Sequence, residues 1–164
     1  MGPEPYSLAI LFAEKLGSFA FNNLRILATY LDDCGTFGGI IENGVYADAE
    51  LDRTPPELRY KYFEPADQPG YSRVAEKVRR RIQFQQHDLL TLQSAGEGFS
   101  LILCKNVLLH FSAAQRAAVI RMFHASLAPG GLLAMEQTQK LPEELGPLFD
   151  RVVADGQIYR RVEA

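Results

Sequence analysis

Short apolar runs that end in polar residues recur along this chain and predict the strands of an α/β protein. Residues 99–104 form a run without polar alternation, which is typical of a parallel strand covered on both faces and placed in the middle of a sheet. Residues 24–31 form a second apolar run, and residues 78–84 lead into a third segment that ends in polar residues. We expect the carboxyl ends of these strands to carry the site, because open α/β sheets bind their ligands there.

Apolar residues at helical spacing predict a helix almost at the start of the chain. Leucine and phenylalanine side chains recur at three- and four-residue steps within residues 4–16, as they do on the buried face of a helix. Pro5 suits the first turn and Gly17 suits the end. Glu4 fits the same first turn as a capping acid.

Ser112 and Gln115 form a capping box, which opens a second long helix that runs through Leu127. The side chains that this helix is predicted to bury are Ala118, Val119, Met122 and Phe123. Beyond it the pattern predicts a strand at residues 132–135, a short helix at residues 142–149 and a terminal hairpin about Asp155-Gly156.

A small antiparallel β excursion is predicted within residues 60–84. Residues 60–63 and 71–74 are strand-like and are separated by a loop rich in proline and glycine. Because no linker or repeat divides the chain, we expect the excursion to be an insert in a single domain that covers residues 1–164. Gly35, Gly38 and Gly39 predict a turn after the strand at residues 24–31.

Composition and charge narrow the possible classes of protein. The 164 residues are 47% apolar and 23% charged, values that favour one folded domain over a disordered chain. The formal net charge of −3 disfavours nucleic acid or an anionic membrane as the main partner. No apolar segment reaches the roughly 18 residues of a membrane span. The two cysteines, Cys34 and Cys104, lack metal-site spacing, so we expect reduced thiols in a cytoplasmic protein without membrane insertion.

Several polar residues stand where the predicted strands end. Asp32 and Asp33 follow the strand at residues 24–31, and they fit either the two hydroxyls of a ribose or ordinary turn chemistry. Asp88 is placed to accept a hydrogen bond from an exocyclic amine. Lys105 and Asn106 interrupt the apolar pattern after residues 99–104, which makes them candidate ligand contacts.

Three blocks of sequence resemble the chemotaxis-receptor methyltransferases of the CheR type. They are Glu-Pro-Tyr-Ser-Leu-Ala at residues 4–9, the pairing of residues 84–90 with 99–111, and residues 127–131 continuing to 159–161. The resemblance implies a bacterial, class I, Rossmann-like methyltransferase that uses S-adenosylmethionine (SAM). It also implies transfer of methyl groups to glutamates of the cytoplasmic region of chemoreceptors, and a small β insert.

Carried over by position, the resemblance assigns roles to individual residues. Glu4 matches the acid beside the cofactor, Asp88-Leu89 matches an Asn-Leu pair near the adenine, and Lys105-Asn106 matches an Arg-Asn pair at the cofactor site. Tyr30 occupies the place of the ribose-binding aspartate, so that role passes to Asp32 or Asp33. His110 stands where the family usually has a tyrosine beside the site of methyl transfer.

The resemblance also implies that a helical domain, a first strand and a glycine-containing loop would precede residue 1. From this we expect weak or no binding of S-adenosylhomocysteine, and pairing of the exposed central strands with a second copy of the chain in a homodimer. Two other functions remain open from sequence. One is a degenerate relative that serves as a binding or interaction module, and the other is a methyltransferase for a small molecule.

Overall fold

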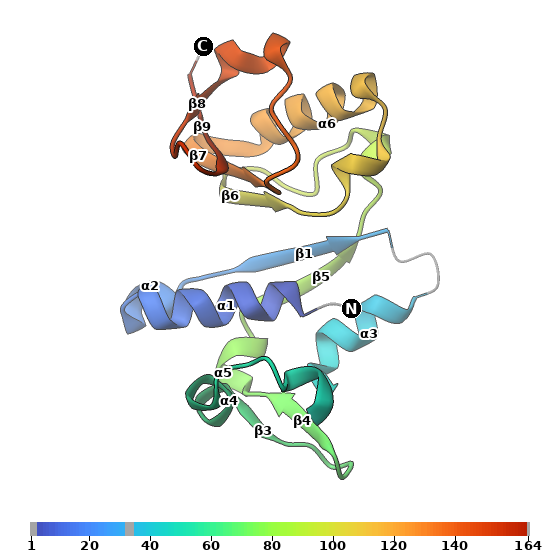
Figure 1. Ribbon diagram of the computed structural model, residues 1–164, viewed down its shortest axis with the longest axis vertical. Helices are drawn as coiled ribbons and strands as arrows, with labels where there is room; N and C mark the ends of the chain where they lie inside the picture. Colours follow the sequence, from blue (N-terminus) through green and yellow to red (C-terminus); the bar gives the residue numbers. More distant parts are fainter. Residues whose placement is uncertain (1–2, 32–34, 164) are drawn as a thin grey trace. The chain divides into compact units, whose positions relative to one another are not determined.

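The computed structural model describes residues 3–31 and 35–163, which form two compact units, one ending at His87 and the other beginning at Asp88 (Figure 1). Each unit has its own apolar core. Parallel strand pairs with helices confirm the predicted α/β class. The single domain over residues 1–164 stays a prediction.

Outside an inserted sheet, the first unit pairs two parallel strands with three helices. β1 (Ile26–Tyr30) lies beside β5 (Ile82–Gln86), with Ile26 opposite Ile82. The helices are α1 (Glu4–Lys15), α2 (Ser18–Asn22) and α3 (Thr36–Asn43). The predicted first helix is confirmed. The predicted turn at Gly38 and Gly39 is wrong, because both glycines lie inside α3 and only Gly35, in a left-handed conformation, precedes it. Buried Ile41 on the same helix offsets the low helix propensity of glycine.

An antiparallel three-stranded sheet is inserted between α3 and β5. Its order is β2 (Val45–Ala47), β4 (Tyr71–Val74) and β3 (Phe63–Pro65). The predicted excursion is therefore present, but it begins at β2 and ends before β5. The remaining elements of the insert are the 3-10 helix η1 (Asp48–Leu51), α4 (Pro56–Tyr62) and α5 (Glu76–Arg79).

Residues 60–62, predicted as strand, belong to α4 instead. The reason is local, because Pro56 fits the first helical position and leaves no amide unsatisfied there. α4 is held to α1 by Glu14, whose Oε1 accepts hydrogen bonds of 2.6 Å from both Lys61 Nζ and Tyr62 Oη. Tyr62 is fully buried, so the helix places an aromatic side chain in the core of the first unit.

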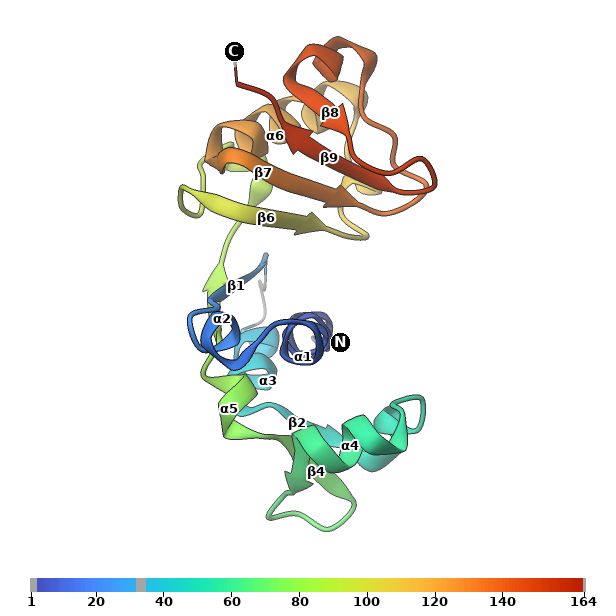
Figure 2. The ribbon, with the colours of Figure 1, turned by 90° about the vertical axis from the view of Figure 1, so that its left-hand side faces the viewer.

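The second unit is a four-stranded sheet with one long helix against it (Figure 2). The strand order is β6 (Phe99–Cys104), β7 (Leu127–Met135), β9 (Gln157–Arg161) and β8 (Phe149–Arg151). β6 and β7 are parallel, whereas β9 is antiparallel to both of its neighbours. The predicted terminal hairpin is confirmed as β8 and β9. The strand predicted at residues 132–135 begins earlier, at Leu127.

The helix on this sheet is α6 (Ala113–Ser126), and its capping box is confirmed by hydrogen bonds between Ser112 and Gln115 in both directions. Its buried side chains include Val119 and Phe123 as predicted, but Ala118 and Met122 are only partly buried. The side chains that replace them in the core are Ala117 and Ile120. Three short 3-10 helices complete the unit: η2 (Leu89–Thr91), η3 (Leu108–His110) and η4 (Glu143–Leu148), the last at the predicted short helix.

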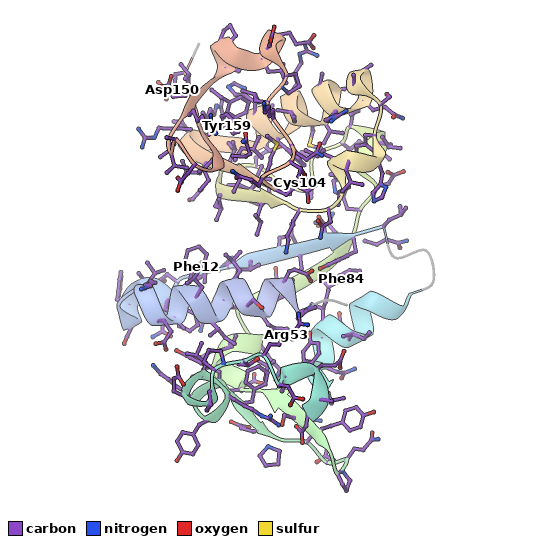
Figure 3. All side chains as sticks on the ribbon, in the orientation of Figure 1. Phe12, Arg53, Phe84, Cys104, Asp150 and Tyr159 are labelled. Carbon is purple, nitrogen blue, oxygen red and sulfur yellow. The ribbon has the colours of Figure 1, made fainter. Side chains whose placement is uncertain are left out.

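The prediction that residues 99–104 lie in the middle of a sheet is wrong for the part of the chain that the structure describes. β6 is an edge strand. At its end, neighbouring side chains face opposite sides of the sheet: Cys104 is buried, whereas Leu103 is 46% exposed. β7 is the only described strand that pairs with β6, and α6 covers only one face of this sheet within the second unit. Cys104 and Tyr159 lie in the core on the covered face (Figure 3).

β1 likewise has one edge that pairs with no other described strand. Two open edges are compatible with the homodimer expected from sequence, which stays a prediction. Within residues 3–31 and 35–163, no helix has both the length and the apolar character needed to cross a membrane.

Candidate functional site

The carboxyl end of β1 brings one predicted site residue, Glu4, into contact with Tyr30. Glu4 is the first residue of α1 and its side chain is exposed. Tyr30 is the last residue of β1 and donates a hydrogen bond to the Glu4 carboxylate. Burial first, and then the negative charge of Glu4, raise the pKa of Tyr30 to about 12. Tyr30 is therefore a neutral hydrogen-bond donor at physiological pH.

An aromatic cluster supports this end of the first unit. The rings of Tyr6 and Tyr46 meet edge to face, with centroids 6.0 Å apart, and the Tyr6 hydroxyl donates to the carbonyl oxygen of Ile41. Burial raises the pKa of Tyr6 to about 12 and raises that of Tyr46 as well, with the nearby Tyr6, Tyr30 and Glu4 adding to the effect on Tyr46. Tyr6 on α1 is therefore tied through its hydroxyl to the backbone of α3.

Asp32, the predicted ribose ligand, and its alternative Asp33 lie outside the described residues. Their roles stay predictions.

In the second unit, Asp88 and Leu89 form a tight turn that begins η2. Asp88 Oδ1 accepts a hydrogen bond of 2.8 Å from the backbone N–H of Leu90. Its other carboxylate oxygen has no hydrogen bond within the described part of the chain. Leu89 is partly buried against the core of this unit. Asp88 is therefore held by its own turn and keeps one oxygen free to accept from a ligand.

Lys105 and Asn106 follow β6, and the backbone of Asn106 is in the left-handed region with φ +59°. Asparagine adopts this conformation more readily than most residues, and such positions concentrate at functional sites. The Asn106 N–H donates to Glu136 Oε2 over 2.9 Å. Glu136 follows β7, so a charge-assisted hydrogen bond joins the carboxyl ends of two adjacent parallel strands.

The side chains of Lys105 and Asn106 are both exposed, as a ligand contact requires. Cys104, just before them, is not a nucleophile. Burial first, and then the charge of Glu136, raise the pKa of its thiol to about 12, and the protonated thiol is the unreactive form.

His110 ends η3 and has an exposed side chain. The turn that carries it is anchored by Leu108, which is fully buried, and by a 3.0 Å hydrogen bond from the His110 N–H to the carbonyl oxygen of Val107. The imidazole itself has no hydrogen bond among the described residues. The structure therefore fixes the backbone of His110 and leaves its ring available.

Sequence reasoning missed Glu136 and the pairing of Tyr30 with Glu4. Glu136 follows an apolar strand, so the same carboxyl-end pattern that marked Asn106 would have found it. No group of three or more potential metal-ligating side chains occurs in residues 3–31 and 35–163. Carboxylate and amide oxygens at strand ends do suit the hydroxyl and amine groups of a nucleoside cofactor.

Comparisons with known proteins agree with this chemistry. The profile of a family described as "CheR methyltransferase, SAM binding domain" matches residues 1–154. A protein named "Chemotaxis protein methyltransferase 1" from Vibrio cholerae is 32% identical over 148 residues, which are 85% of this chain and 51% of that protein. "Chemotaxis protein methyltransferase 2" from Pseudomonas aeruginosa is 34% identical over 139 residues, covering 80% of this chain and 47% of that protein.

Among solved structures, the N-methyltransferase NodS from Bradyrhizobium japonicum in complex with S-adenosylhomocysteine has a TM-score of 0.45 and 16% identity, covering 98% of this chain and 87% of that one. The chain spans about half the length of the curated relatives it matches. The family match and the identities confirm the resemblance found in the sequence: the chain belongs to the CheR methyltransferase family and corresponds to its SAM-binding domain.

Proposed function

We propose that this chain carries the SAM-dependent step of a protein-glutamate O-methyltransferase that acts on the cytoplasmic region of chemoreceptors. The observation that carries the proposal is the strained turn at Asn106, held by Glu136 at the carboxyl end of β6. It presents two exposed polar side chains at the edge where a family of SAM-binding domains is expected to hold its cofactor.

Each candidate residue has a role that fits its surroundings. In the second unit, the free oxygen of Asp88 accepts from the adenine amine, Leu89 packs on the base, and Asn106 and Lys105 hydrogen-bond the polar part of the cofactor. In the first unit, Glu4 and Asp32 are the proposed contacts to the polar groups of the cofactor. The protonated Tyr30 fixes the orientation of the Glu4 carboxylate.

The bound cofactor would supply an electrophilic methyl group on a sulfonium. A substrate carboxylate is already a nucleophile, so the protein has to position it for in-line attack and needs no strong general base. The exposed imidazole of His110 is placed to orient the acceptor by a hydrogen bond. Protonated Cys104 takes no part.

One observation favours a second candidate, a degenerate relative that binds without catalysis. The Glu4 carboxylate already accepts a hydrogen bond from Tyr30, and Tyr30 stands where the family has an acid. If ribose recognition is lost in this way, the fold would serve as an interaction module in the cytoplasm.

The first experiment measures cofactor binding and methyl transfer on the full chain. S-adenosylhomocysteine is titrated by calorimetry, and SAM carrying a labelled methyl group is incubated with a chemoreceptor cytoplasmic fragment. We expect weak but saturable binding, as the sequence led us to expect, and label that base releases as methanol, because carboxyl methyl esters hydrolyse in base. A receptor fragment with glutamine at the acceptor positions is the control. Binding without transfer would support the interaction module, and absence of both would overturn the proposal.

The second experiment removes the Asn106 side chain. Asn106→Gly is expected to weaken S-adenosylhomocysteine binding about 10- to 100-fold, since a lost hydrogen bond from a buried partner costs roughly 1–3 kcal/mol. It should leave thermal stability unchanged or raise it, because glycine adopts φ +59° without strain. Unchanged affinity would show that Asn106 is only a turn residue, whatever the change in stability.

A further inference from the structure

A hollow of about 560 Å³ opens on the second unit between α6 and residues 140–144, which follow β7. Asp88, Leu89, Lys105, Asn106 and His110 do not line it, so the proposed cofactor contacts leave it unassigned. Its lining includes the charged side chains of Arg116, Arg121, Lys140 and Glu144 and the small side chains of Ala113 and Ala117. The size and lining fit a polar side chain with part of its backbone.

The charges in this hollow do not cancel. Arg121 Nη2 pairs with Glu144 Oε1 at 2.9 Å, and both side chains are more than half exposed. Arg116 and Lys140 have no carboxylate partner among the described residues. Two positive charges therefore face the same space uncompensated, in a chain whose net charge is −3.

Arg116 is also held in place. Its Nη1 donates a 3.0 Å hydrogen bond to Oε1 of Gln139, which is only 8% exposed. The contact with this buried amide fixes the orientation of the guanidinium and of its remaining N–H groups. The arginine side chain therefore loses less conformational entropy when an anion binds. A solvated surface arginine has no such support.

The hollow lies at the same end of the sheet as the proposed site residues of this unit. α6 begins three residues after His110, and Lys140 follows Glu136, which holds the Asn106 turn. Because the carboxyl ends of β6 and β7 lead into these two segments, the hollow flanks the edge where methyl transfer is proposed.

We propose that this hollow binds a carboxylate side chain of the acidic protein segment that carries the acceptor glutamate, and this inference rests on the proposed function. The guanidinium of Arg116 takes the carboxylate through paired N–H donors, and the Lys140 ammonium adds a point charge. The site selects segments in which the acceptor has an acidic neighbour.

The test is a binding measurement that needs neither cofactor nor methyl transfer. A helical peptide of glutamate and alanine is titrated into the full chain, alongside the same peptide with glutamine in place of every glutamate. We expect Arg116→Gln/Lys140→Gln to weaken binding of the glutamate peptide at least about tenfold. The control Lys15→Gln/Arg160→Gln changes net charge equally on exposed side chains and should have little effect. The glutamine peptide should bind weakly to every variant.

Lys140→Glu alone provides a second variant that cannot perturb folding through Gln139, since the Lys140 side chain is exposed. Lys140→Glu should lower the affinity for the glutamate peptide at least as much as Lys140→Gln does. Equal affinity of the double variant and its control for this peptide would overturn the proposal. So would inorganic phosphate that binds the hollow as tightly as the peptide, because the site would then be a simple anion site. If the chain binds the cofactor but the substitutions of Arg116 and Lys140 do not change peptide binding, only this inference fails and the proposed function stands.

Discussion

Leu133→Ala is expected to lower the free energy of unfolding by about 2–5 kcal/mol. Leu133 is 0% exposed and lies on β7 between Ile102 of β6 and Tyr159 of β9. Its side chain belongs to the core between the sheet and α6. Truncation removes buried apolar surface and leaves a cavity that a sheet with neighbours on both sides cannot close. Urea unfolding followed by circular dichroism measures the change.

Leu103→Ala is the matched control, because it makes the same chemical change one strand away at a side chain that is 46% exposed. We expect it to cost less than about 1 kcal/mol. If Leu103→Ala costs as much as Leu133→Ala, the face of the sheet opposite α6 is covered in solution. If Leu133→Ala costs under about 1 kcal/mol, the core assigned to this unit is wrong.

Elements whose cause is local could be predicted from the sequence. The capping box of Ser112 and Gln115 sets the start of α6 through hydrogen bonds within one turn. The place of a strand in a sheet has no local cause. An apolar run such as Phe99–Cys104 is compatible with a central strand or with an edge strand packed on one side, and only the partners decide.

The candidate site shows the same division. The rule that ligands bind at the carboxyl ends of parallel strands predicts Asn106 and Asp88 as candidate contacts from apolar-to-polar transitions alone. The Asn106–Glu136 hydrogen bond joins residues 30 positions apart, so the pattern could not pair them. The contact between Tyr30 and Glu4 could not be predicted for a similar reason. A tyrosine at the end of a strand is usually a residue of the core or of its boundary, and the pattern does not indicate its partner.

Raising the pH from about 9 to about 11 is expected to cost the protein about 3 kcal/mol of stability through Tyr6 and Tyr30 alone. The pKa of each hydroxyl is about 12 in the folded protein, mainly because of burial, against 10.0 for an ordinary tyrosine. The folded state therefore holds its phenolic protons over a range in which the unfolded chain releases them. Stability is full below pH about 10 and falls as the pH rises toward the folded pKa. Cys104 acts in the same direction, because burial raises the pKa of its thiol to about 12.

Tyr6→Phe isolates the contribution of one hydroxyl. At neutral pH the variant is expected to lose about 1 kcal/mol, because the hydrogen bond to Ile41 is gone. Its stability should then fall less steeply with pH. Between neutral pH and pH about 11, the variant should lose about 1.4 kcal/mol less than the wild type loses. Urea unfolding at a series of pH values, with tyrosinate absorbance recorded in parallel, measures both effects.

Tyr60→Phe is the control, since that side chain is 93% exposed and its hydroxyl is in water in both states. Identical pH slopes for Tyr6→Phe and the wild type would mean that Tyr6 titrates as an ordinary tyrosine, and the buried aromatic cluster behind Glu4 would have to be discarded.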